Sequence, residues 1–143
     1  MGDEAALTIK SNTQRVMGVL EQMAHEVPGF VHSAVVDLEM ANPVAEYADP
    51  GVSASGLDLG KTASLYTDMV RIHLKNIQCL GGDDALGETQ DMFIATDRFY
   101  MIMKPMPSIM CYQCMLIRRN DNLGIARSVL RRYSDTIETL IKG

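Results

Sequence analysis

The chain has 143 residues, of which 47% are hydrophobic and 22% are charged, so its length and composition are those of one globular domain and not of a disordered segment. Its net charge of −5 argues against nucleic acid or an anionic membrane surface as the main partner, because both are bound by clustered Lys and Arg. Three cysteines, an odd number, do not make a disulfide framework and favour a reducing compartment.

The beginning of the sequence has neither the basic stretch nor the apolar core of a signal peptide. No apolar run approaches the roughly 18 residues that a membrane span needs. We therefore expect a single cytoplasmic domain over residues 1–143, with no insertion into a membrane.

A helix is predicted first, where apolar side chains recur with helical spacing before a Pro-Gly pair. These side chains belong to Val16, Leu20, Met23 and Val27. Residues 30–37 follow as a strand that is apolar on both faces, as in the centre of a sheet. A turn leads to a short return strand at residues 44–47, and residues 49–56 have the composition of a loop.

A second helix is predicted from about Asp58 to Leu80, and it carries two apolar stripes. One stripe consists of Ala63, Tyr66, Val70, Leu74 and Ile77. The other consists of Leu65, Met69 and Ile72. A surface helix of a monomer usually has one apolar face. The second helix is therefore either sandwiched inside the domain or shared with another subunit.

A Gly-Gly pair at residues 81–82 ends this helix. Residues 91–96 and 98–104 then form two strands around a tight turn, and the Pro-Met-Pro segment at residues 105–107 is expected to break the second of them.

Another strand is predicted at residues 109–117, and the last helix covers residues 123–141 with an N-cap from the Asn-Asp-Asn segment that ends at Asn122. The order of elements is α-β-β-α-β-β-β-α. Because the last three strands are linked as hairpins, the sheet is expected to be mainly antiparallel.

The segment Gly56-Leu57-Asp58-Leu59-Gly60-Lys61-Thr62 resembles a phosphate-binding loop only in part. That loop needs four residues between its first Gly and the Gly-Lys pair, which would place the first Gly at Ser55. It should also follow a buried strand, and a Pro-Gly loop precedes it here. We interpret the segment as the start of the second helix and expect no nucleotide hydrolysis.

Cys111 and Cys114 have the spacing of a metal or redox pair. On a strand, residues three apart point to opposite faces, so the two thiols cannot bind one ion. No nucleophile motif accompanies His25, His32 or His73, although a Cys–His pair that meets only in the folded protein remains the alternative. We expect no catalytic residue, no metal and no cofactor, and therefore no enzyme.

Five methionines crowd the late strands: Met101, Met103, Met106, Met110 and Met115. They fill a core or form an adaptable interaction surface. The arginines between residues 118 and 132 are expected to face solvent and to pair with Asp135 and Glu138.

Two segments resemble domains of the Roadblock (dynein light chain) type. Residues 27–37, Val-Pro-Gly-Phe-Val-His-Ser-Ala-Val-Val-Asp, are similar to the first strand of that family. Residues 122–127, Asn-Leu-Gly-Ile-Ala-Arg, look like the start of its last helix. In the family, the Asn caps this helix, and the small residues let the helix lie close to the sheet. Residues 80–83 and the hairpin at 91–103 fit the middle of the family, whereas residues 38–43 replace a shorter turn.

The resemblance implies an α+β, profilin-like architecture: a five-stranded, mainly antiparallel sheet with one helix on one face and two on the other. It also implies a homodimer in which the middle helix and the third strand pair with their symmetry mates, through Leu65, Met69, Ile72 and Phe93. Members of the family are non-enzymatic regulators or scaffolds of small Ras-like GTPases, often for bacterial or archaeal gliding motility, or light chains of motor complexes.

We therefore expect a homodimeric, non-catalytic protein that binds a small Ras-like GTPase and modulates its nucleotide cycle. The candidate partner contacts are Leu57, Leu59 and Tyr66 near the start of the second helix and Met106 in the Pro-Met-Pro segment, because interfaces are enriched in exposed apolar anchors and Met. One alternative is a small-ligand sensor of profilin-like or PAS-like architecture, which would need a concave apolar pocket between sheet and helix. The other is a pure assembly scaffold like a motor light chain.

Overall fold

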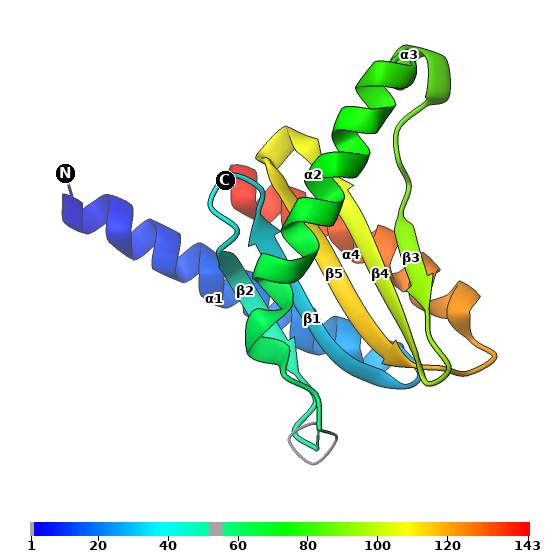
Figure 1. The fold of residues 1–143 in the computed structure, drawn as a ribbon. Coiled ribbons are helices and arrows are strands. Elements are labelled where there is room, and N and C mark those ends of the chain that lie inside the picture. The colour runs from blue at the N-terminus through cyan, green and yellow to red at the C-terminus, as the bar shows by residue number, and fades with distance from the viewer. Residues whose placement is uncertain (1, 52–55) are drawn as a thin grey trace.

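The computed structural model describes residues 2–51 and 56–143. Its five strands form one antiparallel sheet in the order β2-β1-β5-β4-β3 (Figure 1). The strands are β1 (Phe30–Asp37), β2 (Pro43–Ala48), β3 (Met92–Ala95), β4 (Phe99–Met106) and β5 (Cys111–Arg118). The predicted antiparallel α+β sheet is confirmed, with β1 next to its central strand.

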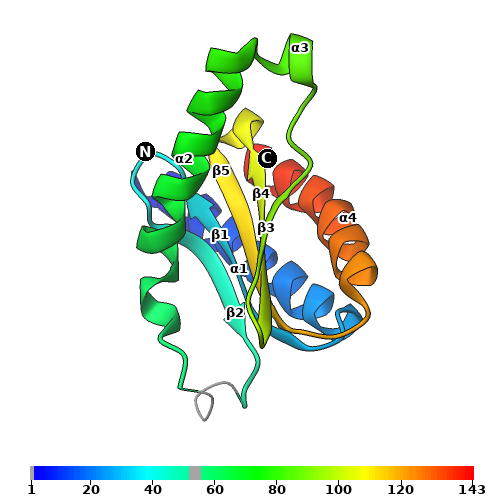
Figure 2. The same cartoon turned by 45° about the vertical axis from the view of Figure 1, so that its right-hand side comes forward.

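Helices cover both faces of the sheet, as Figure 2 shows. Helices α1 and α4 lie side by side on one face, and α2 crosses the other. Their bounds are α1 (Gly2–Glu26), α2 (Thr62–Leu80), the short α3 (Asp83–Leu86) and α4 (Leu123–Lys142), with single-turn 3₁₀ helices at Leu59–Lys61 and Pro107–Ile109. Within the described residues, no helix is both long enough and apolar enough to cross a membrane.

Strand β1 is apolar on both faces because it contributes to two cores. Val35 points towards α1 and α4, whereas Ala34 and Val36 point towards α2. The larger core lies beneath α1 and α4 and buries the predicted stripe of the first helix, Val16, Leu20, Met23 and Val27. The smaller core lies beneath α2 and is built around Val70, Met103, Tyr112 and Cys114.

A polar network crosses the larger core. The Gln113 amide nitrogen donates to Ser33 Oγ at 3.4 Å, and the amide oxygen accepts from Ser134 Oγ at 3.0 Å. Ser33 Oγ in turn donates to the carbonyl oxygen of Cys114 at 2.7 Å. A buried amide is costly unless it is paired, so this network favours the one register in which β1, β5 and α4 meet.

The Pro-Met-Pro segment does not break β4 where the sequence predicts. Strand β4 continues through Pro105, which pairs with Tyr112, and ends at Met106. The neighbouring strand β3 begins only opposite Met103, so Pro105 has a strand partner on one side alone. A residue without an N–H group is tolerated there.

The strand expected at residues 109–117 begins later, at Cys111, because a 3₁₀ turn and the left-handed Met110 (φ 53°) precede it. The N-cap of α4 is Asn122, within the predicted segment, but its side chain makes no capping hydrogen bond. Asn120 shapes this turn instead: its side-chain oxygen accepts the N–H of Asn122 at 2.6 Å, and its nitrogen donates to the Pro28 carbonyl at 3.1 Å.

Candidate protein-interaction surface

The solvent side of α2 is apolar. Leu65, Met69 and Ile72, which the sequence places on a second stripe, are 64%, 37% and 59% exposed, and we call these three residues the outer α2 face. Leu80 extends the exposed apolar surface at the end of the helix. The helix is therefore not sandwiched inside the domain, and the second stripe is open in a single chain.

The opposite side of α2 holds the helix on the sheet. Val70 is fully buried, and Tyr66 and Leu74 pack beside it on the smaller core. The Tyr66 hydroxyl donates to the sulfur of Met101 on β4. The side chain of Ala63, predicted for the same stripe, lies outside the described side chains.

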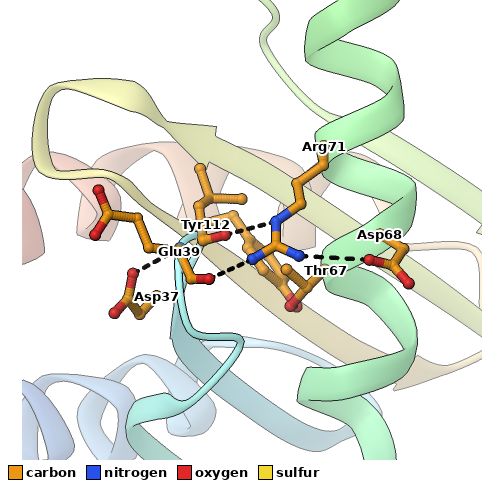
Figure 3. A network of polar contacts seen from close by, with 7 residues as sticks. Asp37, Glu39, Thr67, Asp68, Arg71 and Tyr112 are labelled. Carbon is orange, nitrogen blue, oxygen red and sulfur yellow. Dashed lines mark hydrogen bonds and ion pairs between the residues drawn. The ribbon is translucent and has the colours of Figure 1, made fainter.

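Arg71 fastens α2 to the turn that follows β1 (Figure 3). Its guanidinium donates to the carbonyl oxygens of Leu38 and Glu39, each at 2.6 Å, and lies 3.5 Å from the Asp68 carboxylate. The same turn is stabilised by Asp37, whose carboxylate accepts the Glu39 N–H at 2.8 Å. The position of α2 is thus linked to the conformation of this turn.

A second polar contact joins α2 to the sheet beneath it. The hydroxyl groups of Thr67 and Tyr112 lie 2.9 Å apart, and both residues are fully buried. Burial raises the pKa of Tyr112 to about 12, against a smaller lowering by the Thr67 hydrogen bond. Neither Arg71 nor Thr67 was predicted from the sequence to hold α2 in place. A signal for Thr67 was its place three residues before Val70 on the buried stripe, whereas nothing in the sequence marked Arg71.

Phe93 does not lie on the outer α2 face. It is 49% exposed on the edge strand β3, where Met92 and Ile94 point towards the α2 core and Phe93 therefore points to the other face. The Arg127 guanidinium lies 6.0 Å from the ring centroid and binds the Asp91 carboxylate through two hydrogen bonds of 2.9 and 3.0 Å. In a single chain, the four predicted dimer residues are thus divided between two faces of the sheet.

Met106 is wrong as a partner contact. It is 1% exposed and belongs to the larger core, because β4 continues and points Met106 to the same face as Ile102. Leu57, Leu59 and Tyr66 are half-buried, so each retains some exposed surface. The structure brings these three residues together around a pocket.

This pocket lies between the sheet and the start of α2, with a volume of about 230 Å³. Leu57, Leu59, Leu65 and Tyr66 cover it, and Asp58 and Thr96 are its polar lining residues beside His32. Its floor comes from β1, β4 and β5 and consists of His32, Phe99, Met101, Ile102, Met103, Cys114, Met115 and Leu116. A pocket of the kind that a small-ligand sensor requires is therefore present.

His32 is the polar residue of the pocket floor and is only 2% exposed. Its Nε2 atom lies 3.2 Å from a carboxylate oxygen of Glu46 on β2. Its Nδ1 atom is buried and has no hydrogen-bond partner among the described residues. No role was predicted for this histidine from the sequence, although a histidine within an apolar strand indicates a buried polar group.

The segment that partly resembles a phosphate-binding loop is the start of the second helix, as interpreted. Leu59–Lys61 form a 3₁₀ turn in which the Asp58 carboxylate accepts the Gly60 N–H at 3.2 Å. The same carboxylate lies 3.8 Å from the Lys61 ammonium group. A carboxylate thus contacts the amide and the amine that would have to face a phosphate.

The two cysteines of β5 point to opposite faces, as predicted from their spacing. Cys111 lies in the larger core and Cys114 in the smaller one. Burial raises the pKa of the Cys111 thiol to about 11 and that of Cys114 to about 12, so both stay protonated at neutral pH. Among the described residues, no three His, Cys, Asp or Glu side chains lie close enough to hold a metal ion.

The arginines between residues 118 and 132 do not pair with the acidic residues predicted from the sequence, Asp135 and Glu138. Arg127 binds Asp91, and Arg132 lies 2.6 Å from Glu26 of α1. Glu138, one of the expected partners, accepts a hydrogen bond from Ser108 at 3.0 Å. These ion pairs join different elements instead of successive turns of α4.

Another contact between α1 and α4 involves the same carboxylate. The Tyr133 hydroxyl donates to Glu26, and this hydrogen bond, with the charge of Arg132, holds the pKa of Glu26 below its usual value. The two helices are therefore tied at the end of α1 by contacts that need an ionised Glu26.

The amino-acid sequence matches no protein-family model and no curated protein. The fold, in contrast, is similar to solved structures. Myxococcus xanthus MglB matches with a TM-score of 0.72 and 15% identity, over 90% of this chain and 91% of that one. The gliding protein MglB from Thermus thermophilus matches with a TM-score of 0.70 and 15% identity, over 92% and 91% of the two chains.

A Roadblock/LC7 domain from Streptomyces avermitilis is similar over 89% of this chain and 98% of its own, with a TM-score of 0.70 and 10% identity. Identities this low show a shared fold and leave function to be argued from the surface. The resemblance found in the sequence is confirmed at this level: the chain has the Roadblock-type fold.

Proposed function

We propose that this chain is a non-catalytic homodimeric regulator or scaffold that binds a small Ras-like GTPase and modulates its nucleotide cycle. The observation that carries the proposal is the outer α2 face, where Leu65, Met69 and Ile72 are open to solvent. Large apolar side chains gathered on one helix face favour a protein partner. The Roadblock-type fold supports the same reading by analogy.

Self-association is the first part of the proposal. The outer α2 face suits a symmetric contact with its own copy, because a twofold axis brings the same patch of both subunits together. Strand β3 is an edge strand and offers unpaired backbone groups for a second strand. An MglB with a tetrameric arrangement is similar to this chain, with a TM-score of 0.70 and 16% identity over 92% of this chain and 90% of that one. The assembly of that protein supports self-association of this chain.

Pairing of two β3 edges would also use the face that carries Phe93. Phe93 lies on the other face of the sheet from α2, beside Arg127. A dimer joined at the edge would place both faces next to the partner, so Phe93 remains a proposed interface residue. In this arrangement, the contacts made by α2 lie on one face of the joined sheet and those made by Phe93 lie on the opposite face.

Binding of the GTPase is the second part. Leu57 and Leu59 lie just before α2 and keep exposed surface, which makes them the proposed anchors, together with Tyr66. The protein would act by binding one conformation of the GTPase switch loops more tightly than the other. No arginine is assigned to catalysis, because Arg127 and Arg132 are each paired with an acidic side chain of their own chain.

The test is a binding experiment with small GTPases encoded in the same genome. We expect at least one to bind the wild-type chain, and the double variant Leu57→Ser, Leu59→Ser to bind it at least about tenfold more weakly. Leu86→Ser is the matched control, since Leu86 is an exposed leucine on α3, away from these anchors. Absence of binding to every GTPase would overturn the proposal. If the double variant bound as tightly as the wild-type chain, Leu57 and Leu59 would not be the anchors.

A further inference from the structure

One end of the sheet carries a second exposed apolar surface, and we propose that it binds a basic, amphipathic helix of a partner protein. Two turns form this surface: residues 38–43, which lead from β1 into β2, and residues 107–110, which join β4 to β5. Met40 and Met110 are 69% and 50% exposed there. We call it the two-turn surface, and its exposed apolar residues are Met40, Pro43, Pro107 and Met110. It is separate from the proposed GTPase anchors, which lie at the start of α2.

The two turns form one ordered unit. The N–H of Leu38 donates to the carbonyl oxygen of Met110 at 2.9 Å, so the turns lie side by side at the same end of the sheet (Figure 1). The Arg71 contacts described above hold the first turn from the side of α2. Both methionines are therefore presented by a backbone that is already in place, which lowers the entropic cost of binding.

The backbone of both turns is unusual. Ala41 and Met110, with φ of 57° and 53°, are the two residues other than glycine that have a positive φ in the described ranges. Glycine adopts this left-handed conformation at lower cost. Because Met110 is also half exposed, neither its backbone nor its burial favours methionine at this position. A binding surface does favour it, since a flexible methionine side chain adapts to an apolar partner.

Carboxylates flank the two methionines. Glu39 is exposed and directly precedes Met40. On the other turn, Ser108 donates a hydrogen bond of 3.0 Å to the Glu138 carboxylate, two residues before Met110. Apolar anchors between acidic groups favour a partner whose own anchors lie between Lys or Arg side chains.

The charge next to the first turn is also negative. Asp37 at the end of β1 and Asp68 on α2 add two further carboxylates. Arg71 lies between them, and its guanidinium already contacts two carbonyl oxygens and the Asp68 carboxylate, as Figure 3 shows. A basic protein segment would be attracted to this end of the molecule, whereas an anionic lipid surface or nucleic acid would be repelled.

The backbone of the turns favours a helix over an added strand as the partner. The N–H groups of Leu38, Ala41 and Met110 all donate to carbonyl oxygens of the same two turns or of the end of β1. Arg71 binds the two carbonyl groups at the start of the first turn. An added strand needs free backbone groups with which to pair, but a helix satisfies its own backbone and binds through side chains.

The probe is a helical peptide of about 18 residues made of Leu and Lys, in which Leu recurs with helical spacing. Its matched comparison peptide has Glu in place of every Lys. Both are titrated into the full chain carrying isotope-labelled methionine methyl groups, which are observed by NMR. Met40 and Met110 report on the two-turn surface, whereas Met69 reports on the outer α2 face and Met17 on α1.

Two variants remove contact groups, and each has a control on α1. Met40→Ser removes an apolar anchor, and Met17→Ser is its control, since Met17 is a methionine that is 44% exposed. Glu39→Gln removes a flanking charge, and Glu21→Gln is its control at another exposed position. The methionine spectrum shows at the same time whether each variant is folded.

We expect the Lys peptide to shift the methyl signals of Met40 and Met110 and to leave those of Met17 and Met69 unchanged. It should bind at least about tenfold more tightly than the Glu peptide. Met40→Ser should weaken the Lys peptide about tenfold and Glu39→Gln about threefold, because the first loses apolar contact and the second one attraction. Both control variants should bind like the wild-type chain.

Met110→Gly separates binding from stability. We expect this variant to bind the Lys peptide about fivefold more weakly, since half of the side chain is available for contact. The urea concentration at the midpoint of unfolding should stay about the same, because glycine relieves the left-handed conformation and so offsets the lost packing.

Four results would overturn the inference. The first is the absence of shifts at Met40 and Met110, or shifts at Met69 instead, which would place the peptide on the outer α2 face. The second is equal affinity for the Lys and Glu peptides. The third is a marked fall in the unfolding midpoint of Met110→Gly, which would make Met110 a structural residue. The fourth is loss of self-association by Met40→Ser in analytical ultracentrifugation, which would mean that a second copy covers the surface.

Discussion

Replacing Met69 with Glu tests the outer α2 face. Full burial of a Leu, Ile or Met side chain is worth about 2 kcal/mol. The exposed fractions of Leu65, Met69 and Ile72, 64%, 37% and 59%, then correspond to about 3 kcal/mol per protomer, or about 6 kcal/mol for a symmetric pair. Met69 is the least exposed of the three.

In a dimer, Met69→Glu would place a carboxylate in the contact from each subunit. A buried charge without a partner costs about 3–5 kcal/mol, and a symmetric dimer would contain two of them, so we expect association to weaken at least about ten-thousandfold. The free energy of unfolding of the single chain should change little, because Glu is a good helix former and Met69 is already partly exposed. The substitution therefore separates association from folding.

The assay is analytical ultracentrifugation at micromolar concentration. Met17→Glu is the matched control, since Met17 is also a helical methionine, is 44% exposed and lies on α1 on the other side of the sheet. We expect the wild-type chain and Met17→Glu to sediment as dimers and Met69→Glu as a monomer. A monomeric wild-type chain, or a Met69→Glu dimer of unchanged affinity, would refute the reasoning.

Three further predictions concern stability. Arg71→Leu should lower the free energy of unfolding in urea by about 2 kcal/mol, because two charged hydrogen bonds to the turn after β1 are lost. Lys75→Leu, on an exposed position of the same helix, should change it by less than about 0.5 kcal/mol. Equal effects of the two substitutions would contradict the role of Arg71. The free energy of unfolding should fall as pH rises above about 9, because the thiols ionise there in the unfolded chain. In the folded chain, Cys111 and Cys114 keep their protons up to pKa values of about 11 and 12. A variant with both cysteines replaced by Ala that shows the same slope of stability against pH between about pH 8 and 10 would contradict this prediction. Glu26 has a lowered pKa, so its stabilising effect is present at neutral pH and is lost as pH falls below about 4.5. The difference in the free energy of unfolding between wild type and Glu26→Gln should therefore shrink in acid. A difference that does not depend on pH would argue against the contact of Glu26 with α4.

Much of the fold could be predicted because its signals are local. The apolar run of residues 30–37 marks a central strand, and the two-residue period of a strand is enough to separate Cys111 from Cys114. The outer α2 face was predicted for a similar reason, since one helix carried more apolar residues than one face can hold.

The errors arose where the outcome depends on a distant part of the chain. Pro105 can continue β4 only because β3 begins opposite Met103, and the burial of Met106 follows from that. Without knowledge of the neighbouring strands, a proline predicts the end of a strand. The residue at which a neighbouring strand begins cannot be predicted from the local sequence.

The site shows the same limit. Arg71 finds its acceptors at Leu38 and Glu39, more than thirty residues away, and the pocket combines three strands with the start of α2. Sequence spacing identified Leu57, Leu59 and Tyr66 as a group but not the cavity that they cover. The partner of His32, Glu46, is fourteen residues away on β2, so this contact too could not be read from the local sequence.

The central claim is that the chain binds a small Ras-like GTPase and discriminates between its nucleotide states. The most direct measurement is the affinity of the wild-type chain for one such GTPase loaded with GDP and, separately, with a non-hydrolysable GTP analogue, by calorimetry under identical salt conditions. The account predicts a difference of at least about fivefold, because a regulator shifts an equilibrium only by its differential affinity. Tight binding with equal affinity for both states would contradict regulation and leave a scaffold, and absence of binding to either state would contradict the account as a whole.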